Sequence, residues 1–386
     1  MKHLHLLQNV IVLGLLLITH GAQAQAPQTF IHKTDDANSS NNVSFISNPL
    51  INSTPNGIYL FTHNYSAPGT EGKRHALKVG WYYSGTKWFL YNEDKTPMDT
   101  GLGFNIFVPG VGISSWIVTV DTNSNSTGNT VTIDHPKING DTSAKLFVSS
   151  VWNLNGDPKG VYNTHTFGIY YNIITKKWCI FNQDTKKKMV HGASFNIILL
   201  DKNSNVVHFT QTYKSGNAFN YATIINHPLA NNNPNAHLFI TPIWNPKMTL
   251  FGTYNNHETG VYYDNGRWAI FNEDLVKMDT GVSFNVMLFP NTSTSLKKHE
   301  MTTAINIFPN PLRLGDLLEI NMKNPFIGSC QLELIDMTGK TCKTHTFTKN
   351  DEEYQEQIQI EGLPKGLYII KIWCNGFQVS QMLSID

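Results

Sequence analysis

The chain has 386 residues, and 29 lysines and arginines balance 28 aspartates and glutamates, which gives a formal net charge of +1 with neutral histidine. This balance predicts no basic face, so the composition argues against nucleic acid as a partner. Charged residues make up only 15% of the chain while aromatic residues reach 11%, a combination common in extracellular β proteins, glycan binders among them.

The first 24 residues are typical of a secretory signal peptide. Lys2 gives a positive start, 10–18 is a short apolar run, and 22–24 has the small residues of a cleavage site. We expect cleavage between Ala24 and Gln25. The apolar run is too short for a bilayer, and no other run approaches the ~20 residues that a membrane helix needs. The sequence therefore predicts no integral membrane segment in the mature chain.

A phrase headed by tryptophan recurs three times. KWFLYNED, KWCIFNQD and RWAIFNED place Trp88, Trp178 and Trp268 at a constant spacing of 90 residues. Self-similarity at a fixed long period indicates that one unit was duplicated. Matching opening hairpins set the boundaries of the repeats. The expected segments are unit 1 at 28–109, unit 2 at 115–200, unit 3 at 206–290 and a polar linker at 291–304.

Each unit has the pattern of a β protein. Short runs rich in Val, Ile, Phe, Tyr and Trp alternate with turn residues, and no window shows a helical period. We expect an all-β fold of three tandem β-sandwich or barrel-like units, each with six or seven strands. Separate beads on a string are favoured, and a closed pseudo-threefold assembly stays open. The unit resembles an uncharacterised tandem domain of secreted bacterial proteins, and this resemblance implies no activity.

The last segment, 305–386, departs from the repeat. It contains Phe308-Pro309-Asn310-Pro311, a turn at 336–340 and the run 363–368. These ordered motifs resemble the C-terminal sorting domain of the type IX secretion system of Bacteroidota. The resemblance implies a small Ig-like β-sandwich, the outer-membrane export machinery as a partner, and a location in the extracellular space or on the outer cell surface. In that family the cargo is released or attached to surface polysaccharide, and the sequence leaves this choice open.

Four cysteines are present: Cys179 in unit 2, and Cys330, Cys342 and Cys374 in the last segment. No CxxC pair occurs, so neither a zinc site nor a redox motif is predicted. Cys179 stands where the other units have apolar residues, which indicates a small buried apolar side chain. The spacing leaves the disulfide state of the other three cysteines open.

The triplet Asp-Thr-Gly occurs at 99–101 and 279–281, as in bilobal aspartic proteases. Those enzymes need two buried carboxylates that share one proton. Here the preceding residues are not an apolar strand, unit 2 has Val190-His191-Gly192 instead, and the repeat period accounts for the spacing. A turn is the favoured interpretation. A hydrolase with a site between units is a less favoured alternative, with Asp99 as the residue to test.

Five side chains are candidates for ligand binding. Trp152, Trp244 and Tyr65 stand at equivalent strand ends, where aromatic residues beside loops often bind ligands. His165 and His257 precede the GIYY and GVYY runs; they are favoured as hydrogen-bonded structural residues, because two isolated imidazoles do not form a metal site. The repeated tryptophans of the KW phrases alternate with leucine or isoleucine and are favoured as core.

The triplets at 92–94, 182–184 and 272–274 read Asn-Glu-Asp, Asn-Gln-Asp and Asn-Glu-Asp. Their oxygens could bind calcium, but no EF-hand pattern is present, and caps of their own turns are favoured. The sequence contains no GxSxG, HExxH, P-loop or Rossmann motif. No catalytic residue, metal or cofactor is therefore predicted.

Together these patterns predict a secreted or cell-surface, non-catalytic binding or adhesion protein. A glycan or another surface polymer is the favoured ligand, because a triplicated module raises avidity. The alternative is a structural spacer or matrix protein with no specific ligand. Near-complete burial of Trp152 and Trp244 would favour the spacer. Ligand identity and oligomeric state are left open.

Overall fold

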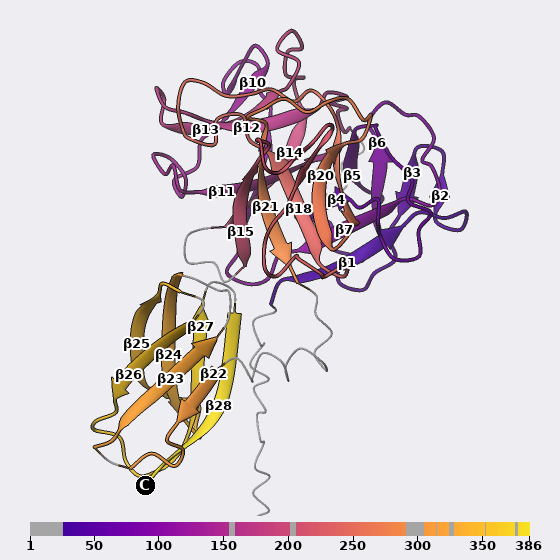
Figure 1. The fold of residues 1–386 in the computed structure, drawn as a ribbon. Coiled ribbons are helices and arrows are strands. Elements are labelled where there is room, and N and C mark those ends of the chain that lie inside the picture. The colour runs from indigo at the N-terminus through magenta and orange to yellow at the C-terminus, as the bar shows by residue number, and fades with distance from the viewer. Residues whose placement is uncertain are drawn as a thin grey trace, which may run out of the picture.

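A computed structural model describes residues 26–153, 159–200, 206–290, 305–313, 315–323, 328–351, 353–374 and 377–386. The signal peptide with its Ala24–Gln25 cleavage site and the linker at 291–304 lie outside the described residues. The described part is built from strands, which confirms the all-β prediction. A search of it found no helix of the length and apolarity that crossing a membrane requires. Figure 1 shows the three units grouped in one body, the head, with the tail domain next to it.

Among the described residues, each unit contributes seven strands to the head. Unit 1 has β1 (Gln28–Lys33), β2 (Ser39–Ser40), β3 (Val43–Phe45), β4 (Leu60–His63), β5 (Val79–Tyr83), β6 (Trp88–Asn92) and β7 (Gly103–Val108). Unit 2 has β8 (Ser114–Thr119), β9 (Ser126–Thr127), β10 (Thr130–Ile133), β11 (Lys145–Val151), β12 (Phe167–Asn172), β13 (Lys177–Asn182) and β14 (Ser194–Leu200). Unit 3 has β15 (Val207–Thr212), β16 (Ala218–Phe219), β17 (Ala222–Ile224), β18 (His237–Pro242), β19 (Thr259–Asp264), β20 (Arg267–Asn272) and β21 (Ser283–Phe289).

Every unit is a sandwich of two antiparallel sheets. In unit 1 the inner sheet has the order β1-β7-β4, and the outer sheet has the order β2-β3-β6-β5. Units 2 and 3 repeat both orders with their own strands. Trp88, Trp178 and Trp268 lie buried between the sheets. Their indole N–H groups donate to carbonyls of their own units at 2.8 to 3.0 Å, so the core prediction for these tryptophans is confirmed.

The three units close into a ring rather than forming separate beads. The outer sheet of unit 1 meets the inner sheet of unit 2 through a parallel bridge between Trp81 and Val151. The equivalent parallel bridges join Ile169 to Ile243, and Val261 back to Asn64. We call these junctions seam 1/2, seam 2/3 and seam 3/1. The separate beads favoured from the sequence are therefore wrong. The sequence did not reveal the ring, because the residues that join the units also fit ordinary turns and strands.

The inner sheets surround a shared apolar core on the pseudo-threefold axis. Equivalent positions of the three units fill this axial core, namely Leu60, Phe147 and Phe239 from one strand and Phe107, Ile198 and Met287 from another. The asparagine of each FN pair crosses to a neighbouring unit. The side-chain amides of Asn105, Asn196 and Asn285 donate to the carbonyls of Leu238, Tyr59 and Leu146 at 3.1, 3.2 and 3.2 Å.

The tail domain is a separate small sandwich. Its sheets are β22-β23-β26 and β25-β24-β27-β28. The strands are β22 (Ile305–Phe308), β23 (Leu317–Lys323), β24 (Gly328–Asp336), β25 (Thr341–Lys349), β26 (Glu353–Gln359), β27 (Gly366–Cys374) and β28 (Phe377–Ile385). Cys330 is disulfide-bonded, and Cys342 is free. In unit 2, Cys179 is free and buried, as predicted.

Candidate functional site

The seams are the places where residues far apart in the sequence meet. At seam 1/2 the side chain of Asn153 binds the backbone of Tyr83 on both sides, accepting from its N–H at 2.9 Å and donating to its carbonyl at 2.8 Å. Asn245 holds Tyr171 in the same way at seam 2/3. At seam 3/1 the hydroxyl of Ser66 takes this role with Tyr263.

A buried carboxylate or amide makes a second bond across each seam. Glu93 accepts the backbone N–H of Asn163 at 2.9 Å. Gln183 and Glu273 occupy the same position and accept the N–H groups of residues 255 and 75 at 3.1 and 3.0 Å. The three side chains are at most 4% exposed. Each unit therefore binds the loop of the next unit, and unit 3 binds unit 1.

The triplets at 92–94, 182–184 and 272–274 cap their own turns, as the sequence indicated, and they also link neighbouring units. Asn92 donates to the carbonyl of Thr96 at 2.9 Å, and Asp94 accepts the N–H of Thr96 at 2.9 Å, so both cap their own turn as expected. The middle residue was not recognised as a link between units. A signal exists in the sequence: the glycine of GWYY, GIYY or GVYY lies under this side chain. A Cβ on Gly80 or Gly260 would lie 2.9 or 2.1 Å from the Oε1 of Glu93 or Glu273.

The two buried glutamates have different surroundings. Glu273 Oε1 lies 2.5 Å from Nδ1 of His63, so this carboxylate has a partner that can carry positive charge. Glu93 has no ion pair among the described residues. Burial raises the pKa of Glu93 to about 7, against the opposing effects of Tyr91, the Asn163 N–H, Lys78 and Ser150. The glutamate at seam 3/1 therefore lies beside a possible cation, whereas the glutamate at seam 1/2 is buried without an ion pair in the part of the chain that the structure describes, and its neutral form is favoured.

An aromatic cluster covers the outside of each seam. Trp152 packs against Tyr82 and Tyr162, with ring centroids 5.4 and 5.7 Å apart. Trp244 packs against Tyr170 and Tyr254 at 5.9 and 5.6 Å. The structure therefore places these two candidate tryptophans at equivalent seams.

Tyr65, the third aromatic candidate, contacts Phe271 at 6.0 Å on seam 3/1. Arg74 stands there at the position that Tyr162 and Tyr254 occupy in the other two units. Seam 3/1 therefore lacks one tyrosine of the cluster, although Tyr262 also packs against Phe271 there, with ring centroids 5.3 Å apart.

The side chains of Tyr65, Trp152 and Trp244 are half-buried, so they are neither core residues nor fully exposed surface residues. A glycine lies against each ring: a Cβ on Gly72, Gly160 or Gly252 would meet Tyr65, Trp152 or Trp244. The indole N–H groups of both tryptophans are buried and have no hydrogen-bond partner in the described part of the chain. Greater exposure is found beside Trp244, where Phe251 is 83% and Tyr254 is 45% exposed.

The two candidate histidines lie on separate seams and do not converge. Nδ1 of His257 lies 2.7 Å from Oδ2 of Asp274, and both side chains are partly exposed. Burial lowers the pKa of His165. No group of three or more potential metal ligands occurs among the described residues. The histidines are placed as ordinary polar residues of the loops that form the seams.

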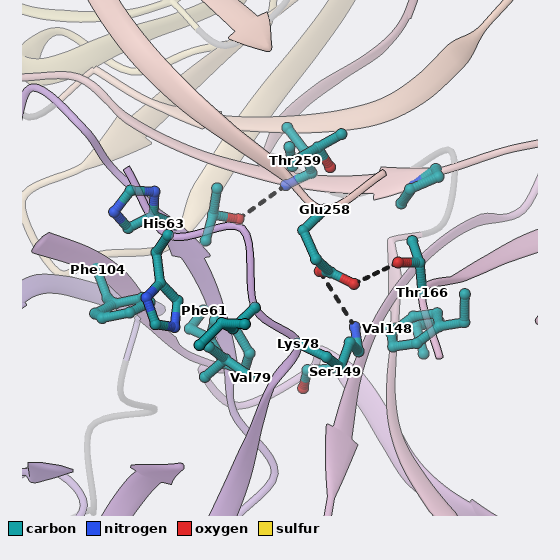
Figure 2. Close-up of a pocket in the computed structure, with 16 residues that line it drawn as sticks. Phe61, His63, Lys78, Val79, Phe104, Val148, Ser149, Thr166, Glu258 and Thr259 are labelled. Carbon is teal, nitrogen blue, oxygen red and sulfur yellow. Dashed lines mark hydrogen bonds and ion pairs between the residues drawn. The ribbon is translucent and has the colours of Figure 1, made fainter. Parts of the chain in front are cut away.

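A small cavity opens on the pseudo-threefold axis, lined by all three units (Figure 2). Equivalent positions present Lys78, Thr166 and Glu258: the ammonium lies 3.8 Å from Glu258, and the threonine hydroxyl donates to Glu258 at 2.6 Å. His63 also lines the cavity, and its Nε2 atom is buried without a partner in the described residues. The volume of ≈ 70 Å³ accommodates a few water molecules and is too small for a sugar ring.

The Asp-Thr-Gly triplets are turns. Gly101, Gly192 and Gly281 have positive φ angles of 82°, 84° and 99°, and each donates its N–H to the carbonyl of the residue that follows the first strand of its unit. Asp99 is exposed and lies 3.5 Å from the ammonium of Lys73. The buried, proton-sharing arrangement of an aspartic protease is thus not formed at Asp99.

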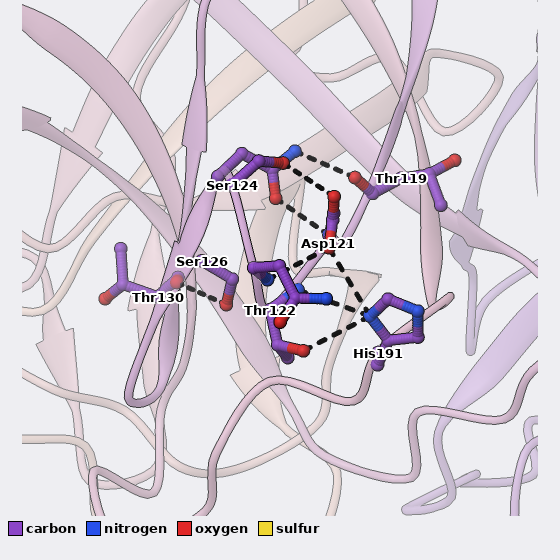
Figure 3. Close-up of polar contacts among 9 residues, drawn as sticks. Thr119, Asp121, Thr122, Ser124, Ser126, Thr130 and His191 are labelled. Atoms are coloured by element: carbon purple, nitrogen blue, oxygen red, sulfur yellow. Dashed lines mark hydrogen bonds and ion pairs between the residues drawn. The ribbon is translucent and has the colours of Figure 1, made fainter.

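Asp121 and Ser124 lie on the exposed turn between β8 and β9, and His191 approaches them from the turn before β14 (Figure 3). Ser124 donates its hydroxyl to Asp121 at 2.7 Å, and His191 Nδ1 lies 3.8 Å from the same carboxylate. A nucleophilic serine must instead donate to the histidine. This group is a turn cap that holds the loop between β8 and β9.

Comparisons with known proteins concern families more than single relatives. A family model described as a domain of unknown function (DUF7452) matches residues 19–108, 112–199 and 168–288. A second, described as a secretion system C-terminal sorting domain, matches residues 306–386. No curated protein matches the chain.

Two solved structures show weak similarity. A trimeric ectodomain of the C. elegans fusion protein EFF-1 is 8% identical over 94% of this chain and 88% of its own, with a TM-score of 0.18. A structure titled biofilm associated protein, BSP domain, is 10% identical over 95% of this chain and 67% of its own, with a TM-score of 0.17.

Proposed function

The chain belongs to the DUF7452 family and ends in a type IX sorting domain, and we propose that it acts as a non-catalytic binding or adhesion protein. The sorting domain marks proteins that are secreted to the extracellular space or the outer cell surface. Export implies contact of the tail with the outer-membrane export machinery. A cleaved signal peptide, an origin in Bacteroidota and display on the cell surface belong to the same proposal.

The observation that carries the proposal is the aromatic cluster on each seam. Half-exposed tyrosine and tryptophan rings combine an apolar face with a polar edge, a combination that suits the faces of sugar rings. The clusters form only where two units meet, so the closed ring presents three of them at once. Repetition of a weak site raises avidity. A glycan or another surface polymer is the ligand class that we favour.

Seam 2/3 offers the best point for a test, because Phe251 and Tyr254 are well exposed there. The mature full-length protein is applied to a polysaccharide array, next to the double variant Phe251→Ala, Tyr254→Ala. We expect wild-type binding to at least one polymer and a loss of about tenfold in apparent affinity for the double variant. Ile174→Ala is the matched control, since Ile174 is 79% exposed on the turn between β12 and β13. No binding by the wild type, or equal losses in control and variant, contradicts the proposal.

The structural spacer is the second candidate, and one observation favours it. Gly160 and Gly252 lie against the rings of Trp152 and Trp244, so part of each ring already packs within the head. In this alternative the tryptophans wedge the units together and no polymer binds. A hydrolase with a site between units has no comparable support, because Asp99 is exposed and lies beside Lys73.

A further inference from the structure

The three seams contain the same buried hydrogen bond to a backbone N–H, but the accepting side chain has different surroundings in each. At the same buried position seam 2/3 has the neutral Gln183, seam 3/1 has Glu273 beside His63, and seam 1/2 has Glu93. In each case one oxygen accepts a backbone N–H of the next unit. Only an oxygen acceptor is required for this bond, so a protonated glutamic acid and a glutamine serve equally well.

The groups that face Glu93 come from four elements. Tyr91 lies on β6, Lys78 directly precedes β5, Ser150 lies on β11, and Tyr162 belongs to the unit 2 loop. Lys78 is the one cation among them, and its ammonium already lies 3.8 Å from Glu258 and 3.9 Å from the centre of the Phe167 ring. An ionised Glu93 would therefore be a buried charge that shares its nearest cation with another carboxylate, which is costly.

We propose that seam 1/2 is a proton-dependent latch, closed while Glu93 is protonated and loosened when Glu93 ionises, whereas Gln183 holds seam 2/3 closed at every pH. Loosening acts first on the loop that carries Tyr162 and Asn163. Trp152 and Tyr162 belong to the aromatic cluster of the same seam, so the latch controls the order of that cluster alone.

The direction of the effect follows from the pKa of Glu93. Because the folded-state pKa is raised from 4.5 to about 7, the stability that the protonated acid contributes is fully present below pH 4.5. It is lost as the pH rises through about 7, and the loss is complete above that value. The shift corresponds to a change on the order of 100-fold in the equilibrium between the closed and open seam.

The test compares the full mature chain with Glu93→Gln, which copies the side chain found at seam 2/3. We expect equal melting temperatures at pH 4.5 and a variant that melts about 5 °C higher than the wild type at pH 8. Hydrogen exchange at the amide of Asn163, corrected for the intrinsic pH dependence, should show protection that falls with pH in the wild type and stays constant in the variant. A difference in melting temperature that does not change with pH would overturn the latch.

The reverse substitution, Gln183→Glu, keeps the inference falsifiable if the first variant folds poorly. It should introduce the same pH-dependent loss of stability at seam 2/3 and the same loss of protection at the amide of Asn255. A Gln183→Glu protein with wild-type pH dependence would also overturn the proposal. Neither readout uses a ligand, so the failure of polymer binding and the failure of the latch are separate results.

Discussion

The head and the tail domain are both built from β-sandwiches, but the head buries many polar side chains and the tail buries few. Tail strands alternate between buried and exposed residues, as in β22 and β23. Among buried polar or charged residues in the described part of the chain, Lys349 is the one that belongs to the tail. The head buries many, and Asn105, Asn196 and Asn285 are fully hidden. The difference teaches that the tail is stabilised mainly by its apolar core, whereas the head uses buried polar groups to join its units.

The reason is geometric. A strand with one face in water needs apolar residues on the other face only, so its sequence alternates. Strands β7, β14 and β21 are buried on both faces, because the axial core covers the side that a lone sandwich would leave exposed. Polar groups in such strands must find partners, and the side-chain amides of Asn105, Asn196 and Asn285 find theirs on a neighbouring unit. They therefore specify how the units meet as well as stabilising the contact.

The largest expected effect concerns unit 2 expressed alone, as residues 112–200. Copies of unit 2 can form the seam hydrogen bonds with one another. Gln183 of one copy can accept the N–H of Asn163 of the next copy, and Asn153 of one copy can bind the backbone of Tyr171 of another. The axial residue of unit 2 is the neutral Thr166. We expect this fragment to form a homotrimer in sedimentation experiments.

Unit 1 provides the matched control, since three copies would bring three Lys78 side chains together on the axis. That fragment should stay monomeric and unfolded. A folded, monomeric unit 2 would show that the seams are dispensable, and the contrast between head and tail would then disappear.

Glycine substitutions give the next largest effect. A Cβ on Gly252 would lie 2.0 Å from the backbone oxygen of Trp244, so Gly252→Ala must displace the seam itself. We expect a loss of about 4 kcal/mol in the free energy of unfolding of the head. In the tail, Gly339 has φ of 90° and open space around it, so Gly339→Ala should cost only about 1 kcal/mol of backbone strain. Urea unfolding of both variants measures the difference, and similar values would contradict it.

The smallest of the three effects concerns single polar bonds. Asn105→Ala leaves the carbonyl of Leu238 without its donor inside the head, and we expect a loss of about 3 kcal/mol. Gln357 in the tail donates to Glu319 at 2.9 Å on the exposed surface. Gln357→Ala should change stability by less than about 0.5 kcal/mol. Thermal unfolding followed by circular dichroism decides the point; a Gln357→Ala loss as large as that of Asn105→Ala would refute the contrast.

The fold class could be predicted because it depends on local pattern. Alternation, turn residues and the period of Trp88, Trp178 and Trp268 are all visible along the chain, and so are the tail motifs. The site could be predicted only in part. Trp152, Trp244 and Tyr65 share a position, but the sequence does not show that Tyr82 or Tyr170 of the preceding unit packs against the two tryptophans. Glu93 was assigned to its own turn because its partner, the N–H of Asn163, is a backbone group that any residue could supply.

Ring closure has a consequence for the order of folding. The contact between His63 and Glu273 joins residues 210 positions apart, and the contacts described across seam 3/1 are all non-covalent. Contacts of such long range form late and slowly. A nascent chain cannot complete the head until its third unit has been synthesised, so units 1 and 2 remain without the partner that closes the ring until then.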